Sequence, residues 1–192
     1  LGRCLDGEVV DLLDQRQVAS GEIRIDGEPY SASRQQMQSR KFFSLPEEPL
    51  RNACIAGMSV AENLALRNFD RSPLCRYGWL INRRAIREQA GELIGRFNVR
   101  PADPERPIGT LSGGNVQRAV LARELPEDVR VLVVSNPVFG LDFASVAAIH
   151  QRLRDARARG TAILLLSEDL DELLELSDRI LVIHEGRIQF ET

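Results

Sequence analysis

The chain has 192 residues, 28% of them charged, and its net charge is −3. This length allows one sizeable domain with its own core, and the slightly acidic balance excludes the general attraction to nucleic acid that strongly basic proteins have. The three cysteines are far apart and follow no metal-binding spacing, so the sequence predicts no metal site. No apolar run approaches the ~20 residues of a membrane-spanning helix. The start carries no signal-peptide pattern, and its abruptness is compatible with an upstream segment.

The first quarter of the chain is predicted to contain a helix, a hairpin and a strand. Apolar residues at helical spacing predict a helix over 5–17. The stretch GEIRIDGEPY alternates apolar and polar residues around Asp26-Gly27, which is typical of a β-hairpin. KFFSLPEEP predicts a short strand that ends at Pro46.

The middle third is predicted to be helical and without strands. In MSVAENLAL, Ser59 followed by Glu62 three residues later is the pattern of a capping box at a helix start. Asn82 is expected to cap a second helix, which carries one apolar stripe and ends at residue 97. The segments RNFDRSPLCRYGWLI and VRPADPERPIGT are expected to be loops. Residues 50–125 should therefore form a helical subdomain beside a sheet.

Two aromatic residues, Tyr77 and Trp79, fall in the first of these loops. Aromatic side chains in loops usually pack against the protein, and we expect the same here. The alternative is a platform for a base, which is the rarer role of such residues.

The second half alternates strands and helices and ends in a hairpin that turns at Glu185-Gly186. The predicted elements are a helix from Ser112, strands over 131–134, 161–166 and 179–183, and helices over 143–159 and 169–176. This alternation predicts a mostly parallel sheet with helical crossovers.

One glycine-rich helix start, LSGGNVQRAVLAREL, has the features of an anion-binding site. Backbone N–H groups at a helix N-terminus point outward, and the helix dipole favours negative charge there. Gly113 and Gly114 permit close approach of a ligand, and Ser112 adds a hydroxyl donor. By itself the Ser-Gly-Gly sequence is equally compatible with a flexible entry into the helix.

A second candidate lies at the end of the apolar strand in VLVVSNPVFGLD. Ligands of open α/β sheets gather at the carboxyl ends of the strands, where Ser135 and Asn136 stand in this chain. Neither side chain ionises at neutral pH, so neither supplies the carboxylate that a metal-phosphate site needs. The alternative is that both residues simply end the strand in a polar turn, which Ser and Asn favour.

LSGGNVQR resembles the signature motif of the ATP-binding-cassette (ABC) ATPases, and the resemblance continues in order along all 192 residues. SGEIRIDGEPY resembles the stretch after the P-loop helix, LPEEP the Q-loop, VLVVSNP the Walker B strand, GLD the D-loop and SEDLDELLELSDRI the switch region. Within that family the chain most resembles the degenerate second cassette of simple-sugar and purine-nucleoside importers.

The resemblance implies an α/β fold with a P-loop-NTPase-like core, a helical subdomain and a small antiparallel β portion. It implies that residues 1–192 form a single, N-terminally incomplete nucleotide-binding domain. It also implies that the signature binds nucleotide through Leu111, Ser112, Gly113, Gly114 and Gln117. Glu47 takes the Q-loop glutamine position and Asp142 belongs to the D-loop.

Several family positions carry residues that do not support the usual chemistry. Ser135 stands where the family has a magnesium-binding Asp, and Asn136 stands where it has the Glu that activates water. Glu168 replaces the switch histidine, so the catalytic assignment of Asn136 and Glu168 is degenerate. The P-loop lysine should fall near Leu5, where GxxxxGK[ST] is absent. Whether this chain is an enzyme is therefore left open.

The resemblance implies ATP and Mg²⁺ as cofactors, shared with a partner cassette that lies upstream in the same polypeptide or in a dimer. Further implied partners are the transmembrane permease and, indirectly, a solute-binding protein, but no nucleic acid. The implied location is cytoplasmic, on the inner face of the cell membrane. Two alternatives remain: a non-catalytic module that docks the permease, and an ATPase whose P-loop lies upstream. The transported solute is not specified by the sequence.

Overall fold

The computed structural model describes residues 23–138, 140–184 and 187–192. The helix predicted over 5–17, the P-loop position near Leu5 and the turn at Glu185-Gly186 lie outside the described residues. The chain divides into two compact units. Among the described residues, the first unit comprises those of 23–47, 128–137 and 150–192, and the second comprises those of 48–127 and 138–149.

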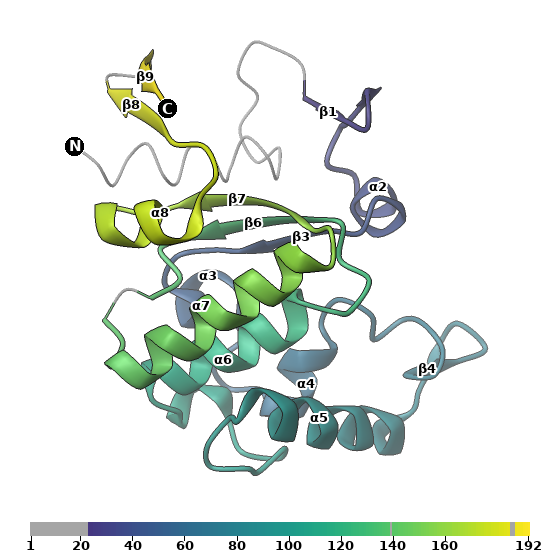
Figure 1. The fold of residues 1–192 in the computed structure, drawn as a ribbon. Coiled ribbons are helices and arrows are strands. Elements are labelled where there is room, and N and C mark those ends of the chain that lie inside the picture. The colour runs from purple at the N-terminus through teal and green to yellow at the C-terminus, as the bar shows by residue number, and fades with distance from the viewer. Residues whose placement is uncertain (1–22, 139, 185–186) are drawn as a thin grey trace. The chain divides into compact units, whose positions relative to one another are not determined.

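The first unit is built on a parallel three-stranded sheet in the order β3-β6-β7 (Figure 1). The strands are β3 (Phe42–Leu45), β6 (Val131–Ser135) and β7 (Ala162–Leu166). The central strand β6 is the most buried because it has a neighbour on each side, with Leu132 and Val134 fully inaccessible. Between β6 and β7 runs α7 (Phe143–Ala158), and α8 (Leu170–Leu176) follows β7. The predicted parallel sheet with helical crossovers is confirmed.

Two antiparallel hairpins belong to the same unit. The first pairs β1 (Arg24–Ile25) with β2 (Glu28–Pro29) around Asp26-Gly27, as predicted, and both turn residues have positive φ. The second pairs β8 (Leu181–His184) with β9 (Arg187–Glu191), again as predicted.

A short helix that the sequence did not predict, α2 (Arg34–Ser39), follows the first hairpin. It starts at Ser33, whose hydroxyl accepts a hydrogen bond from the Gln36 backbone N–H. Tyr30 and Phe42 contact each other with tilted rings whose centroids are 5.1 Å apart, and with Val133 they form a small apolar cluster. This cluster fixes the hairpin side of the unit to the sheet.

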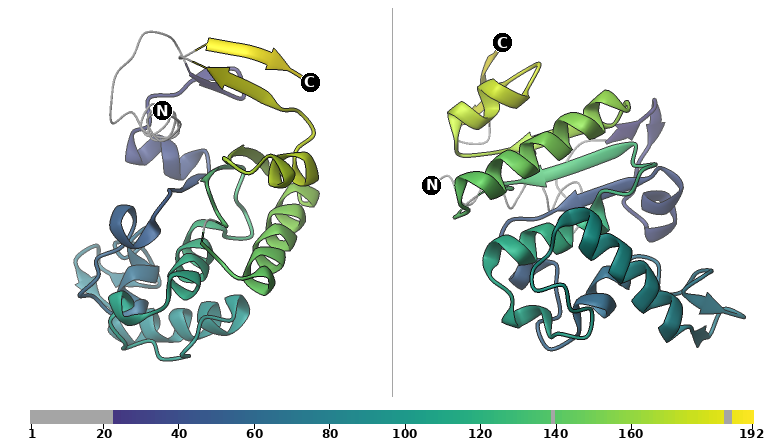
Figure 2. Two further views of the ribbon diagram at one scale, coloured as in Figure 1. Left: turned by 90° about the vertical axis from the view of Figure 1, so that its left-hand side faces the viewer. Right: turned by 60° about the horizontal axis from the view of Figure 1, so that its bottom comes forward.

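The second unit is helical, with α4, α5 and α6 packed against one another (Figure 2). Its elements are α3 (Pro49–Asn52), α4 (Val60–Ala65), α5 (Arg83–Phe97), the single 3₁₀ turn η1 (Ile108–Thr110) and α6 (Gly113–Glu124). The predicted capping box is present: Ser59 Oγ accepts from Glu62 N–H (3.1 Å) and Glu62 Oε2 accepts from Ser59 N–H (2.9 Å). Asn82 caps α5 through its side-chain oxygen, also as predicted. Among the described residues, no helix is both long enough and apolar enough to cross a bilayer.

The prediction that the middle third has no strands is wrong. A hairpin of β4 (Cys75–Arg76) and β5 (Leu80–Ile81) precedes α5. Two-residue strands leave no alternation of apolar and polar residues to detect in a sequence. The expectation that Tyr77 and Trp79 pack against the protein is also wrong, because they are 86% and 76% exposed.

A buried ion-pair cluster joins elements of the second unit. Glu124, at the end of α6, is completely inaccessible. It accepts two hydrogen bonds from Arg67 Nε (3.1 and 2.9 Å) and one from Arg123 Nε (2.6 Å). Arg123 in turn donates to the backbone oxygens of Ala53 and Asn63. Such a cluster is stable only while every charge keeps its partner.

Candidate functional site

The start of α6 is the best-formed candidate binding feature of the second unit. Ser112 is the N-cap residue in extended conformation, and Gly113 and Gly114 form the first turn. The Ser112 side chain does not cap the helix; its Oγ accepts a hydrogen bond from Asn115 Nδ2 (2.9 Å). The first N–H groups of any helix have no intrahelical acceptor, so this exposed end presents donors and the positive end of the helix dipole.

The two glycines differ in what surrounds them. A Cβ added to Gly113 would meet no atom within 4 Å, and one added to Gly114 would make ordinary contacts with Leu141 and Ser145 at 3.5 and 3.6 Å. Neither glycine has a positive φ. Packing within the described chain therefore does not require glycine at position 113, whereas close approach by a phosphate or another protein surface would.

The other two predicted signature residues face inward. Leu111 is 8% exposed and Gln117 is 5% exposed. Both are placed to support the start of α6, and the exposed part of the signature consists of Ser112 and Gly113, with Gly114 half-buried.

A hydrogen-bonded chain that sequence reasoning missed connects α6 with the predicted D-loop. Arg118 Nη2 donates to Ser145 Oγ (2.8 Å), and Ser145 Oγ donates to Asp142 Oδ2 (2.5 Å). Asp142 Oδ1 also accepts from the Ser145 backbone N–H (3.0 Å). The side-chain and backbone hydrogen bonds from Ser145 hold the pKa of Asp142 below its usual value. An exposed carboxylate is thus kept ionised and fixed in orientation close to the first turn of α6.

In the first unit, the remaining predicted positions follow three neighbouring parallel strands. Glu47 comes two residues after β3, Ser135 ends β6 with Asn136 directly behind it, and Glu168 comes two residues after β7. Because the strands are parallel, these residues share one edge of the sheet. Ser135 is 2% exposed and Asn136 is 8% exposed, whereas Glu168 is exposed.

Asn136 has a structural role that the sequence alone only suggested. Its φ is +43°, in the left-handed region that Asn tolerates better than most residues. Its N–H donates to the Leu166 oxygen (2.8 Å), and its Oδ1 accepts from the Glu168 N–H (3.1 Å). Asn136 thereby ties the segment after β7 to the end of β6.

A second set of contacts involves the same segment. Ser167 Oγ donates to Glu172 Oε2 (2.6 Å), and Glu172 Oε1 lies 2.9 Å from His150 Nε2. His150 on α7 and Glu172 on α8 are 22 residues apart and both are buried. No local spacing in the sequence signals such a pair, and it was not predicted.

Ser135 and Asn136 offer a magnesium ion no carboxylate. Among the described residues, no group of three His, Cys, Asp or Glu side chains is placed to hold a metal. Asn136 Oδ1 accepts a backbone hydrogen bond, and Ser135 is an uncharged hydroxyl. Hard divalent cations prefer carboxylate oxygens, which Ser135 and Asn136 lack. An exposed helix start such as that of α6, in contrast, favours an anion such as phosphate.

Comparison with known proteins places the chain in a family. The sequence model of the ABC transporter family matches residues 10–138. The nucleoside import ATP-binding protein NupA of Lactococcus lactis subsp. cremoris is 39% identical over 174 residues, which cover 90% of this chain and 34% of NupA. The ribose import ATP-binding protein RbsA 2 of Rubrobacter xylanophilus is 38% identical over 173 residues, covering 89% of this chain and 33% of RbsA 2. The chain thus spans about one third of the length of these relatives.

Solved structures agree on the fold. The dimeric ATP-binding cassette MJ0796, in a post-hydrolysis state bound to ADP and Pi, superposes with a TM-score of 0.77 at 18% identity. The match covers 97% of this chain and 79% of MJ0796. CbiO1 of Clostridium perfringens, part of the ABC transporter complex CbiONQ, gives a TM-score of 0.70 at 20% identity, covering 96% of this chain and 71% of CbiO1. The chain therefore has the α/β fold of an ABC ATPase cassette, and it belongs to the ABC transporter family.

Proposed function

We propose that this chain is an ATP-binding part of an ABC-type importer of the sugar or nucleoside class, and that its signature residues complete an ATP site whose P-loop belongs to a second cassette. The observation that carries the proposal is the start of α6, which is exposed and has a glycine at position 113 that nothing in the described chain requires. The names of the relatives, which refer to nucleoside and ribose import, support the solute class.

In the proposed site Ser112 and the N–H groups of Gly113 and Gly114 contact the terminal phosphate of ATP bound to the partner. A helix N-terminus stabilises negative charge, and this interaction strengthens as charge develops during hydrolysis. Asp142 is held by Ser145, which in turn accepts a hydrogen bond from Arg118, and these contacts orient the predicted D-loop beside this surface. ATP bound to the partner, together with its Mg²⁺, supplies the driving energy.

The proposal assigns the remaining predicted partners and location. The second cassette lies in the same polypeptide or in a dimer, and the transmembrane permease and a solute-binding protein complete the importer. The location is cytoplasmic, on the inner face of the membrane. The importer relatives and the dimeric state of MJ0796 support this assembly.

The test is Gly113→Asp in the complete transporter. The carboxylate would cover the helix start and repel the phosphate, while the open space around Gly113 lets the fold accept the change. Loss of one such stabilising donor group commonly lowers turnover by ~10²–10³-fold, so we expect at least about a 100-fold loss of ATP turnover and of transport, with assembly unchanged in size-exclusion chromatography.

Gly91→Asp is the matched control. Gly91 is an exposed glycine on α5 in the same unit, and a Cβ there also meets nothing within 4 Å. This variant should keep full activity. Full activity of the Gly113 variant would instead favour a non-catalytic module that docks the permease. ATP hydrolysis by the isolated chain would favour the independent ATPase.

A further inference from the structure

The β4–β5 hairpin presents an apolar tip that the proposed ATP site does not use. Tyr77 and Gly78, both with positive φ, form the turn, and the Trp79 N–H donates to the Arg76 oxygen (3.3 Å). Four large apolar side chains of this hairpin are exposed, and we call them the aromatic tip: Tyr77 (86%), Trp79 (76%), Leu80 (46%) and Ile81 (50%). Large apolar side chains that cluster on a surface usually mark an interaction site.

The base of the hairpin is fixed while the tip projects. Leu74 and Cys75 are buried at 1% and 7% exposure, and the Asn82 N–H donates to the Leu74 oxygen (2.7 Å). Figure 1 shows β4 at the end of the helical unit, projecting past α5. The exposure of the aromatic tip is therefore a property of an anchored hairpin within this unit.

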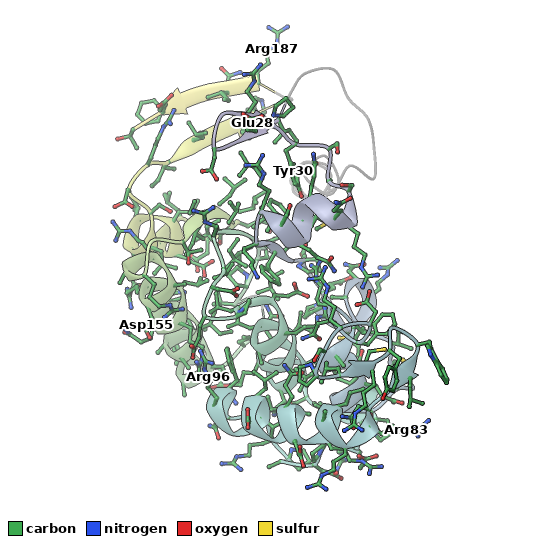
Figure 3. All side chains as sticks on the ribbon, turned by 90° about the vertical axis from the view of Figure 1, so that its right-hand side faces the viewer. Glu28, Tyr30, Arg83, Arg96, Asp155 and Arg187 are labelled. Carbon is green, nitrogen blue, oxygen red and sulfur yellow. The ribbon has the colours of Figure 1, made fainter. Side chains whose placement is uncertain are left out.

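Arginines flank the aromatic tip along the chain. Residues 71–87 contain five arginines and no acidic residue, in a chain whose net charge is −3. Arg76 and Arg83 are both exposed, and Arg83 begins α5 directly after the hairpin (Figure 3). Arg84 and Arg87 are partly neutralised by Glu88 and Glu105. Arg83 also lies near the carboxylate of Glu62, so Arg76 and the partly compensated Arg83 supply the charge beside the tip that attracts an anionic surface.

We propose that the aromatic tip binds the surface of an anionic lipid bilayer, with Tyr77 and Trp79 in the interfacial layer and with Arg76 and Arg83 contacting lipid phosphates. Trp and Tyr concentrate at this layer because their rings are amphipathic. Basic residues beside a few inserted apolar side chains give reversible, charge-dependent membrane binding. A standard protein interface buries about 800 Å² per partner, which a projecting tip of four side chains does not provide.

This contact involves neither ATP nor the signature residues, so it is tested independently of the proposed function. Trp79 is the only tryptophan of the chain, and its fluorescence therefore reports on the tip alone. The probes are vesicles of phosphatidylcholine mixed equally with phosphatidylglycerol, and vesicles of phosphatidylcholine alone. The mixed vesicles should shift Trp79 emission to the blue, and bromine-labelled acyl chains should quench it. Raised salt should reverse both effects because the attraction is screened.

Variants separate the two components of binding. Each basic residue near an anionic surface contributes about fivefold, so the double change Arg76→Gln and Arg83→Gln should weaken binding about 30-fold. Trp79→Ala should weaken binding as well. Because this variant lacks the only tryptophan, its binding is measured by co-sedimentation with the vesicles. Phe143→Ala is the control, since Phe143 is 96% exposed but lies outside the tip, and it should bind like the unaltered chain. All four sites are exposed, so circular dichroism and melting should stay unchanged.

Two results would overturn the proposal. One is unchanged Trp79 emission in the presence of the mixed vesicles, which would leave a protein as the occupant of the tip. The other is equal binding by the unaltered chain and by the Arg76/Arg83 and Trp79 variants, which would place any lipid contact elsewhere.

Discussion

Asn136 combines two properties at a single residue: a left-handed backbone and a side-chain oxygen that holds the Glu168 N–H. The sequence resemblance assigns Asn136 to the position of the glutamate that activates water in ABC ATPases, so Asn136→Glu is the obvious attempt to restore activity. A general base helps only where phosphate and metal are already positioned, and Ser135 next to it supplies no carboxylate. Restoring one residue therefore does not restore the site.

We predict that Asn136→Glu gives no Mg²⁺-dependent hydrolysis of ATP and lowers stability. A non-glycine residue held at positive φ costs of the order of 1–3 kcal/mol, and glutamate tolerates that region less well than Asn. The new carboxylate would also lie next to Glu168. Urea unfolding and phosphate release measure the two effects. Asn136→Gly is the control: it relieves the backbone but loses the hydrogen bond. Clear hydrolysis by the glutamate variant would contradict the prediction.

Elements of the second unit are joined by the buried cluster around Glu124. Removing one partner of a buried pair typically costs 3–5 kcal/mol, because the other charges stay buried without compensation. Glu124→Ala would leave Arg67 and Arg123 facing each other without their carboxylate. We predict a loss of about 3–5 kcal/mol in the free energy of unfolding, measured by chemical denaturation.

The exposed pair Arg96–Glu127 provides the comparison. These side chains are 3.1 Å apart, and Glu127 is 78% exposed. Exposed pairs contribute about 0–1 kcal/mol, so Glu127→Ala should change the unfolding free energy by no more than that. Equal effects of the two alanine variants would show that Glu124 is not a structural link.

The accuracy of the sequence predictions differs between kinds of element for physical reasons. Helix starts with local signals, such as Ser59 with Glu62 and the cap at Asn82, were predicted because the determining hydrogen bonds join residues three apart. The hairpin at Cys75–Ile81 was missed because its strands are too short to show a pattern. The contact of His150 with Glu172 joins two different helices, and only the folded chain shows it.

The candidate site was predicted unevenly for the same reason. Ser112 to Gly114 are recognisable because the signature is contiguous in sequence. Asp142 is held by Ser145, and Ser145 accepts a hydrogen bond from Arg118, 27 residues away in the sequence. Only the structure reveals this contact. The inward orientation of Gln117 likewise follows from packing around α6.

At the scale of the whole molecule, we predict that the chain alone hydrolyses ATP at no more than a trace rate. Loss of a single catalytic group commonly costs ~10²–10⁴ in rate. The sequence resemblance assigns Ser135, Asn136 and Glu168 to positions where the family uses other residues. Turnover at about 1 s⁻¹, the low end for ordinary enzymes, in a preparation free of contaminating ATPases would contradict this prediction. A mock purification from cells without the gene is the necessary control.

The position of β7 affects how samples of this chain should be handled. Within the described residues β7 is an edge strand of its sheet, and its residue Leu164 is 43% exposed. An edge strand with apolar side chains can pair through its backbone with a strand of another molecule. Crowded solutions therefore favour aggregates joined edge to edge, and dilution shifts the balance towards single molecules. Spectroscopic titrations of this protein should be carried out at low protein concentration, with light scattering recorded on the same sample.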